Sequence, residues 1–219
     1  MTIKQNVQKI LGELPSGVEL VAAAKTRRPE EILEAIESGV KIIGENYLQE
    51  TEKLFPYIER TVKWHYIGSI QKNKIKKIIK IFDMIETVDS IDVLREIDKR
   101  AKAADKMMPV LIEVNSGREE QKSGIYPEQV ESLVNAAAPF ENVLIRGLMT
   151  MGPFTDDPEK LRPYFKLTKD LFDYLKVRET KNAQMKYLSM GMSDSYKIAI
   201  REGANIVRIG TSIFGPRQR

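Results

Sequence analysis

The chain has 219 residues, of which 42% are hydrophobic and 30% are charged, and its formal net charge at pH 7 is +4. It contains no cysteine and a single histidine, His65, which excludes disulfides, thiolate metal sites, a cysteine nucleophile and a multi-histidine zinc site. No apolar run approaches the roughly 20 residues that a spanning helix needs, so we expect a soluble protein, folded as one domain over residues 1–219.

The first residues form a helical pattern rather than a signal peptide. Apolar side chains recur at helical spacing at Ile3, Val7, Ile10, Leu11 and Leu14. The apolar centre and the cleavage site of a signal peptide are missing from this segment. We therefore expect an amphipathic helix at the N-terminus and a cytoplasmic location, which the lack of cysteine also permits.

Short apolar segments then alternate with longer helical patterns to the end of the chain. The predicted strands are 18–25, 40–45, 63–68, 83–88, 108–115, 144–151, 186–191 and 205–210. The predicted helices between them are 29–38, 46–60, 71–82, 90–104, 127–138, 158–177 and 194–202. This alternation favours an α/β fold, a single (β/α)8 TIM-type barrel with an extra N-terminal helix, over a doubly wound open sheet.

The densest run of positive charge is QKNKIKKIIKIF at 71–82. Its apolar residues Ile75, Ile78, Ile79 and Phe82 share one helical face, so its lysines occupy the other. Aromatic residues that would stack on bases are not interleaved with these lysines. The run therefore indicates a solvated helix surface, and we expect no nucleic acid partner.

Lys25 follows the apolar run Leu20 to Ala24 at the end of the first predicted strand. In a parallel barrel the C-terminal ends of the strands surround a common mouth, where barrel sites are built. A lysine amine in that mouth can attack an aldehyde and form a Schiff base. The alternative is a lysine whose stem is buried while its ammonium group reaches water.

The last two predicted strands end in residues that suit a phosphate. Gly210 allows close approach of the backbone, and Thr211 offers a hydroxyl beside it. Ser193 precedes a predicted helix, where it can cap the helix, bind a phosphate, or do both.

Arg208 stands inside the apolar strand at 205–210 and therefore requires a partner, because an unpaired buried guanidinium is costly. Either a carboxylate such as Glu113 or the ring nitrogen of a bound cofactor would serve, and the sequence alone favours the carboxylate.

Two polar residues accompany the second and third predicted strands. Asn46 is placed to cap the following helix. His65 fits a hydrogen-bonded core imidazole slightly better than a catalytic base.

Seven segments, in this order and spread over essentially the whole chain, carry a resemblance: AAAKTRRPEEI, IGENYLQE, WHYIGSIQKNK, NSGREEQKSGI, IRGLMTM, LSMGMSDSYKIAI and VRIGTSIFG. Together they resemble the pyridoxal phosphate homeostasis proteins, the YggS and PROSC family, which is related to the N-terminal barrel of alanine racemase. The resemblance implies that fold, and pyridoxal 5'-phosphate (PLP) held as a Schiff base on Lys25.

The resemblance also implies roles for other residues at the mouth. Arg208 would lie against the pyridine nitrogen; because arginine stays protonated, that nitrogen would stay unprotonated and the ring would be a weaker electron sink. His65 and Lys122 are secondary candidates, Lys122 as a further phosphate or cofactor contact. The remaining cofactor-binding residues are Asn46 in the pocket wall and Ser193, Gly210 and Thr211 at the phosphate.

One position departs from the family pattern. Ser195 stands where the family usually has an aspartate, and Asp194 precedes it. We expect Asp194 to preserve the charge at the start of the helix.

By resemblance, the protein would bind PLP, act in intracellular vitamin B6 homeostasis and deliver PLP to apo PLP-dependent enzymes, as a monomer or weak homodimer. The alternative is a PLP-dependent amino-acid racemase with weak or specialised activity. Racemases of this type append a second domain that supplies a second acid/base, whereas this chain ends at Arg219, so we expect no efficient racemase activity. A barrel that binds a phosphorylated metabolite without covalent chemistry is a third possibility.

Overall fold

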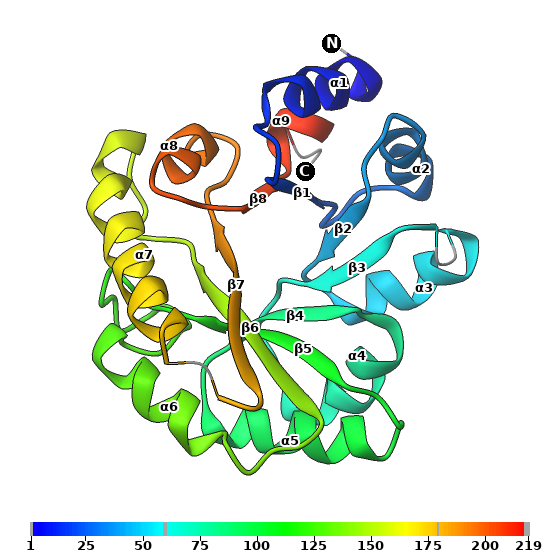
Figure 1. The fold of residues 1–219 in the computed structure, drawn as a ribbon. Helices are drawn as coiled ribbons and strands as arrows, with labels where there is room; N and C mark the ends of the chain where they lie inside the picture. The colour runs from blue at the N-terminus through cyan, green and yellow to red at the C-terminus, as the bar shows by residue number, and fades with distance from the viewer. Residues whose placement is uncertain (1, 59–60, 179, 217–219) are drawn as a thin grey trace.

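The computed structural model describes residues 2–58, 61–178 and 180–216. Within them, parallel strands β1 to β8 pair in chain order and close into a barrel, and helices surround it (Figure 1). The predicted barrel is confirmed and the open sheet is wrong. The strands are β1 (Glu19–Ala23), β2 (Ile42–Glu45), β3 (Lys63–Tyr66), β4 (Met84–Val88), β5 (Met108–Glu113), β6 (Val143–Thr150), β7 (Ala183–Met190) and β8 (Ile206–Ile209).

The helices follow the predicted pattern, with short 3-10 turns opening three of the predicted segments. The α-helices are α1 (Ile3–Glu13), α2 (Pro29–Glu37), α3 (Leu48–Ile58), α4 (Ile75–Ile81), α5 (Ile91–Lys102), α6 (Val130–Ala136), α7 (Arg162–Lys176), α8 (Tyr196–Arg201) and α9 (Thr211–Phe214). The 3-10 turns are η2 (Lys72–Lys74), η3 (Pro127–Gln129) and η4 (Pro158–Leu161). The end of the third predicted helix, at 59–60, lies outside the described residues.

Most element ends agree with the prediction to within two residues, and two segments differ by more. β7 begins at Ala183 rather than at 186, because exposed Gln184 and Lys186 alternate with buried residues and hide the start of the strand. Helix α9 was not predicted, since the segment after β8 was expected to be a turn. Its four residues are too few to show helical periodicity.

The N-terminal helix is confirmed as α1, which packs against α2 and α9 (Figure 1). Val7 and Ile10 are buried, whereas Leu11, expected on the same apolar face, is 36% exposed. Asn6 Nδ2 donates to the Ile213 carbonyl at 2.9 Å, which joins α1 to α9. No helix in the described part of the chain has both the length and the apolar character needed to cross a membrane.

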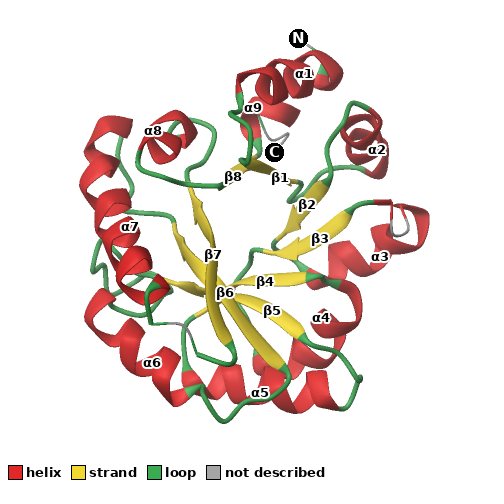
Figure 2. Ribbon diagram, in the orientation of Figure 1, coloured by secondary structure: helices red, strands yellow, loops and turns green. Residues whose placement is uncertain are grey.

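Figure 2 shows the helices around the strands of the barrel, and the main hydrophobic core is made of residues from both layers. The ring centroids of Trp64 and Phe55 lie 5.9 Å apart, and the rings of Tyr66 and Phe82 pack edge to face. The apolar face of α4 is buried in the same layer, so the lysines of 71–82 lie toward solvent as predicted.

The interior of the barrel changes from apolar to polar along the strands. Two apolar clusters pack on Tyr187, one of Val21, Ile42 and Ile206 and the other of Met84, Leu111 and Met149. Because residues i and i+2 of a strand share a face, Glu86, Ser189 and Arg208 form the next interior level. On β1 and β2, Ala23 and Gly44 belong to this same level. Lys25 and Asn46 follow two residues later in the chain and lie at the mouth of the barrel.

Candidate functional site

A pocket of about 230 Å³ opens at the mouth of the barrel, where β1, β2, β7 and β8 end. It is lined by Ala23, Lys25, Arg27, Asn46, Met192, Ser193, Asp194, Arg208, Gly210 and Thr211. All six primary site residues of the sequence analysis are among them. The closed barrel therefore brings together residues that lie far apart in the chain, and we call this space the Lys25 pocket.

Lys25 lies in a tight turn that follows β1. Arg27 N donates to the Ala24 carbonyl at 2.9 Å, and Thr26 at the centre of the turn has a φ of 64°. This left-handed conformation is rare for a β-branched residue and is held by a bond from Thr26 N to Glu50 Oε2 at 3.0 Å. The half-buried Lys25 carries its Nζ to 4.8 Å from the centre of the Tyr47 ring, a cation–π contact.

Arg27 is a pocket residue that the sequence analysis did not identify. Its Nη1 donates to the Phe214 carbonyl at 3.1 Å and its Nη2 donates to the Gly215 carbonyl at 2.5 Å. These bonds tie the Lys25 turn to the end of α9. No sequence signal could have found this role, because both partners are backbone carbonyls at the end of a helix that was not predicted.

The loops after β7 and β8 meet at one end of the pocket. Ser193 Oγ accepts a hydrogen bond from Ser212 N at 3.2 Å. A Cβ on Gly210 would lie 3.1 Å from the Ala23 carbonyl oxygen, so glycine at this position lets the β8 loop approach β1 closely. The Ser193 hydroxyl thus lies beside the Ser212 amide, and Thr211 lines the same end of the pocket, a set of groups that suits a phosphate.

Ser195, at the position where the resemblance implies an aspartate, is buried and has a local partner. Its Oγ accepts from Met192 N at 3.1 Å, which closes the loop between β7 and α8. An aspartate carboxylate can accept the same kind of bond. The neighbouring Asp194 is exposed and lines the Lys25 pocket.

Asn46 lies between the Lys25 pocket and its neighbour. Its Nδ2 donates to the Ile67 carbonyl at 3.3 Å, which links the end of β2 to the end of β3. A Cβ on Gly68 would fall 2.1 Å from the Asn46 carbonyl oxygen, so only glycine permits this approach of the two loops.

Arg208 is buried, and its partners come from three other strands. Its Nη1 donates to Ser189 Oγ at 2.5 Å and its Nη2 donates to the Thr150 carbonyl at 2.9 Å. The carboxylate oxygen Oε2 of Glu86 lies 3.8 Å from Nη1 of Arg208. The expectation of a carboxylate partner is confirmed, but the carboxylate is Glu86 rather than Glu113, because Ser189 contacts both Glu86 and Arg208 and holds them side by side.

Glu113 instead lines the neighbouring pocket. Burial and the nearby Asp89 raise the pKa of this carboxyl to about 7, against the opposing charge of Arg208. The positive charge of Arg208 therefore acts to lower the pKa of Glu113, although the two side chains do not form an ion pair.

The structure places His65 in the barrel interior, below the mouth. Its Nδ1 lies 2.6 Å from Glu86 Oε1, and both side chains are buried. Burial acts to raise the pKa of Glu86, but the hydrogen bond with His65, the charge of Arg208 and the Ser189 hydroxyl together lower it. Glu86 is thus held as a carboxylate.

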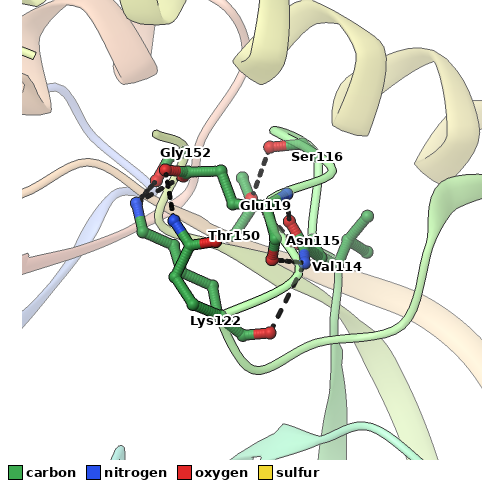
Figure 3. Close-up of polar contacts among 8 residues, drawn as sticks. Val114, Asn115, Ser116, Glu119, Lys122, Thr150 and Gly152 are labelled. Atoms are coloured by element: carbon green, nitrogen blue, oxygen red, sulfur yellow. Dashed lines mark hydrogen bonds and ion pairs between the residues drawn. The ribbon is translucent and has the colours of Figure 1, made fainter. Parts of the chain in front are cut away.

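Lys122 lies in a second pocket of about 290 Å³ that shares Asn46 with the Lys25 pocket. Lys122 Nζ pairs with Glu119 Oε2 at 2.5 Å and donates to the Gly152 carbonyl at 3.3 Å (Figure 3). Asn115 Nδ2 donates to the Glu119 carbonyl at 2.8 Å and so shapes the loop that carries Lys122. Lys122 is therefore a neighbour of the Lys25 pocket, not part of its lining.

Comparisons with known proteins agree with this architecture. Residues 1–218 match the family model described as the N-terminal domain of alanine racemase. The chain is 42% identical to the pyridoxal phosphate homeostasis protein of Aquifex aeolicus, with 91% of this chain and 87% of that protein covered. It is 35% identical to the protein of the same name from Pasteurella multocida, with 98% and 94% covered.

One solved structure is similar to this chain over the full length of the solved chain. PipY of Synechococcus elongatus PCC7942, with PLP bound, superposes with a TM-score of 0.90 at 26% identity. The match covers 98% of this chain and 100% of that one.

Proposed function

Because the chain belongs to the family of pyridoxal phosphate homeostasis proteins, we propose that it binds PLP as a Schiff base on Lys25 and acts in intracellular vitamin B6 homeostasis. The observation that carries this proposal is the composition of the Lys25 pocket. One space holds the Lys25 amine, the Arg208 guanidinium and the Ser193 and Thr211 hydroxyls. These groups complement the aldehyde, the ring nitrogen and the phosphate of PLP.

Each residue of the pocket then has a role in binding. Lys25 holds the aldehyde, and Ser193 and Thr211 bind the phosphate where Gly210 lets the backbone approach. Asn46 forms the wall toward the second pocket, where Lys122 is a secondary contact for a ligand that enters or leaves.

Arg208 favours binding over catalysis. PLP supplies an electron sink only to the extent that its ring nitrogen is protonated, and a guanidinium facing that nitrogen disfavours its protonation. Glu86 and Ser189 hold Arg208 in this place. We therefore propose a PLP-binding and delivery protein with little racemase activity; a racemase turnover on the order of 10 per second would contradict this.

The proposal extends to organisation and partners. The chain acts as a single PLP-binding domain over residues 1–219, in the cytoplasm, as a monomer or weak homodimer. Its recipients are apo PLP-dependent enzymes, and nucleic acid is not a partner.

The first experiment tests the attachment of PLP. The protein is mixed with PLP, its absorbance spectrum is recorded, and borohydride reduction is followed by peptide mass mapping. We expect a yellow protein with the label fixed at Lys25, and loss of both in Lys25→Ala. Lys76→Ala is the matched control, since this exposed lysine on α4 lies outside the pocket. Label spread over surface lysines would overturn the proposal.

The second experiment tests delivery. PLP-loaded protein is added to an apo PLP-dependent enzyme in the presence of a scavenger that consumes free PLP. Recovery of the enzyme's activity that outpaces recovery with the same amount of free PLP supports delivery. Equal or slower recovery would contradict it.

A further inference from the structure

We infer that Glu86 is a positioning residue for Arg208, acting through the Ser189 hydroxyl, and that it thereby sets the affinity of the Lys25 pocket for the ring nitrogen of PLP. This inference rests on the proposed binding of PLP. It concerns residues of the barrel interior on β4, β7 and β8, three of the strands labelled in Figure 2.

Both terminal nitrogens of the Arg208 guanidinium donate hydrogen bonds within the barrel. Nη1 donates to Ser189 Oγ and Nη2 donates to the Thr150 carbonyl, which belongs to the backbone of β6. Because the guanidinium is planar, two fixed ends also fix the plane of the group. Arg208 is 4% exposed and lines the Lys25 pocket, so this orientation decides which N–H edge a ligand meets.

The Ser189 hydroxyl can accept a hydrogen bond from Arg208 because it donates its own hydrogen to Glu86. A serine hydroxyl has one hydrogen to donate. Ser189 Oγ lies 2.6 Å from Glu86 Oε2, to which it donates, so its lone pairs face Nη1 of Arg208. A neutral amide oxygen at position 86 is a weaker acceptor than the carboxylate, so in Glu86→Gln the hydroxyl is held less firmly and its hydrogen can turn toward the arginine.

Glu86 is itself locked in place. His65 Nδ1 lies at 2.6 Å from Oε1, while Ser189 occupies Oε2. The carboxylate is fully buried and its pKa is lowered, so it stays ionised and balances the charge of Arg208. His65, Glu86, Ser189 and Arg208 thus form one chain of contacts across the barrel that ends at the pocket.

The experiment compares two ligands that differ at one atom. PLP is measured against its analogue in which carbon replaces the ring nitrogen, which keeps the aldehyde and the phosphate. For the wild-type protein we expect the nitrogen to strengthen binding about tenfold, the scale of one charge-assisted hydrogen bond. In Glu86→Gln we expect most of this preference to be lost through weaker binding of PLP, with the affinity for the analogue changed less than about twofold.

Two further variants sharpen the test. Ser189→Ala keeps every charge but removes the bridging hydroxyl, and it should show the same selective loss; it also carries the test if Glu86→Gln fails to fold. Glu45→Gln is the matched control, because Glu45 is an equally buried carboxylate on β2 that faces away from the barrel interior. It should keep the full preference for PLP over the analogue.

The outcomes separate this inference from the proposed function. If Glu86→Gln or Ser189→Ala weakens both ligands equally, the interior contacts serve general structure and the inference is overturned. A wild-type protein that binds both ligands equally would overturn it too, since Arg208 would then not sense the nitrogen. Failure of borohydride to fix PLP at Lys25 would instead overturn the proposed function.

Discussion

Glu86 in the barrel interior and Glu45 in the layer between strands and helices are both fully buried, yet their environments act in opposite directions. Glu86 meets His65 and Ser189, and its pKa is lowered. In the part of the chain that the structure describes, neither carboxylate oxygen of Glu45 has a hydrogen-bond partner. Burial is the main cause that raises the pKa of Glu45 to about 8, and the negative charge of the nearby Glu50 is the second.

The difference follows from the faces of the strands. Met84 points into the barrel, so Glu86 does as well and can reach residues of other strands across the interior. On β2, Ile42 is interior and Ile43 belongs to the outer core, so Glu45 faces the apolar side of the helices. Equal burial therefore accompanies opposite pKa shifts, because His65, Arg208 and Ser189 lower the pKa of Glu86, whereas burial and the charge of Glu50 raise that of Glu45.

The largest effect is expected from a substitution that removes the buried cation of the barrel interior. Arg208→Met should lower the free energy of unfolding by about 4 kcal/mol at pH 7, because it leaves the Glu86 carboxylate buried without its cation. Urea denaturation without added PLP measures this. The double variant with Glu86→Gln should be less destabilised than the sum of the two single variants, and strict additivity would show that the two groups do not interact.

The next effect tests the outer layer. Since the folded protein keeps a proton on Glu45 that the unfolded chain releases above its usual pKa of 4.5, this group makes stability fall as the pH rises from about 4.5 to about 8. Glu45→Gln should remove this fall and raise the free energy of unfolding by about 3 kcal/mol at pH 7. Urea denaturation as a function of pH measures both changes.

Glu86→Gln is the contrasting variant in the same titration. The pKa of Glu86 is lowered in the folded state, so its ionisation stabilises the fold above about pH 4.5 and this contribution is lost as the pH falls below that value. Its replacement should cost stability at neutral pH and less in acid. A Glu45→Gln variant with the same pH dependence as the wild type would contradict the assignment of Glu45.

The smallest effect removes the outermost contact of the interior chain. His65→Phe keeps a planar ring but leaves Glu86 Oε1 without its partner, which should lower the free energy of unfolding by about 2 kcal/mol. Lys63→Ala on the same strand is exposed and should change it by less than about 0.5 kcal/mol. Equal effects of the two substitutions in thermal denaturation would show that His65 contributes no specific bond.

Much of the fold and part of the site could be predicted before any coordinates. The alternation of strands and helices identified the barrel, and the apolar run before Lys25 placed this lysine at the mouth. Helix α9 and the contacts of Arg27 could not be predicted, because a four-residue helix has no period and its carbonyls carry no side-chain signal.

The sequence by itself thus determined the alternation of strands and helices and the strand ends that form the mouth, because hydrophobic periodicity is a local property of the chain. Only the tertiary structure decided that Arg208 is balanced by Glu86 rather than by Glu113, and that the Glu45 carboxylate has no hydrogen-bond partner among the residues that the structure describes. Glu86 and Ser189 meet across 103 positions of sequence. Such a meeting depends on the relative heights of strands in a closed barrel, which no local pattern records.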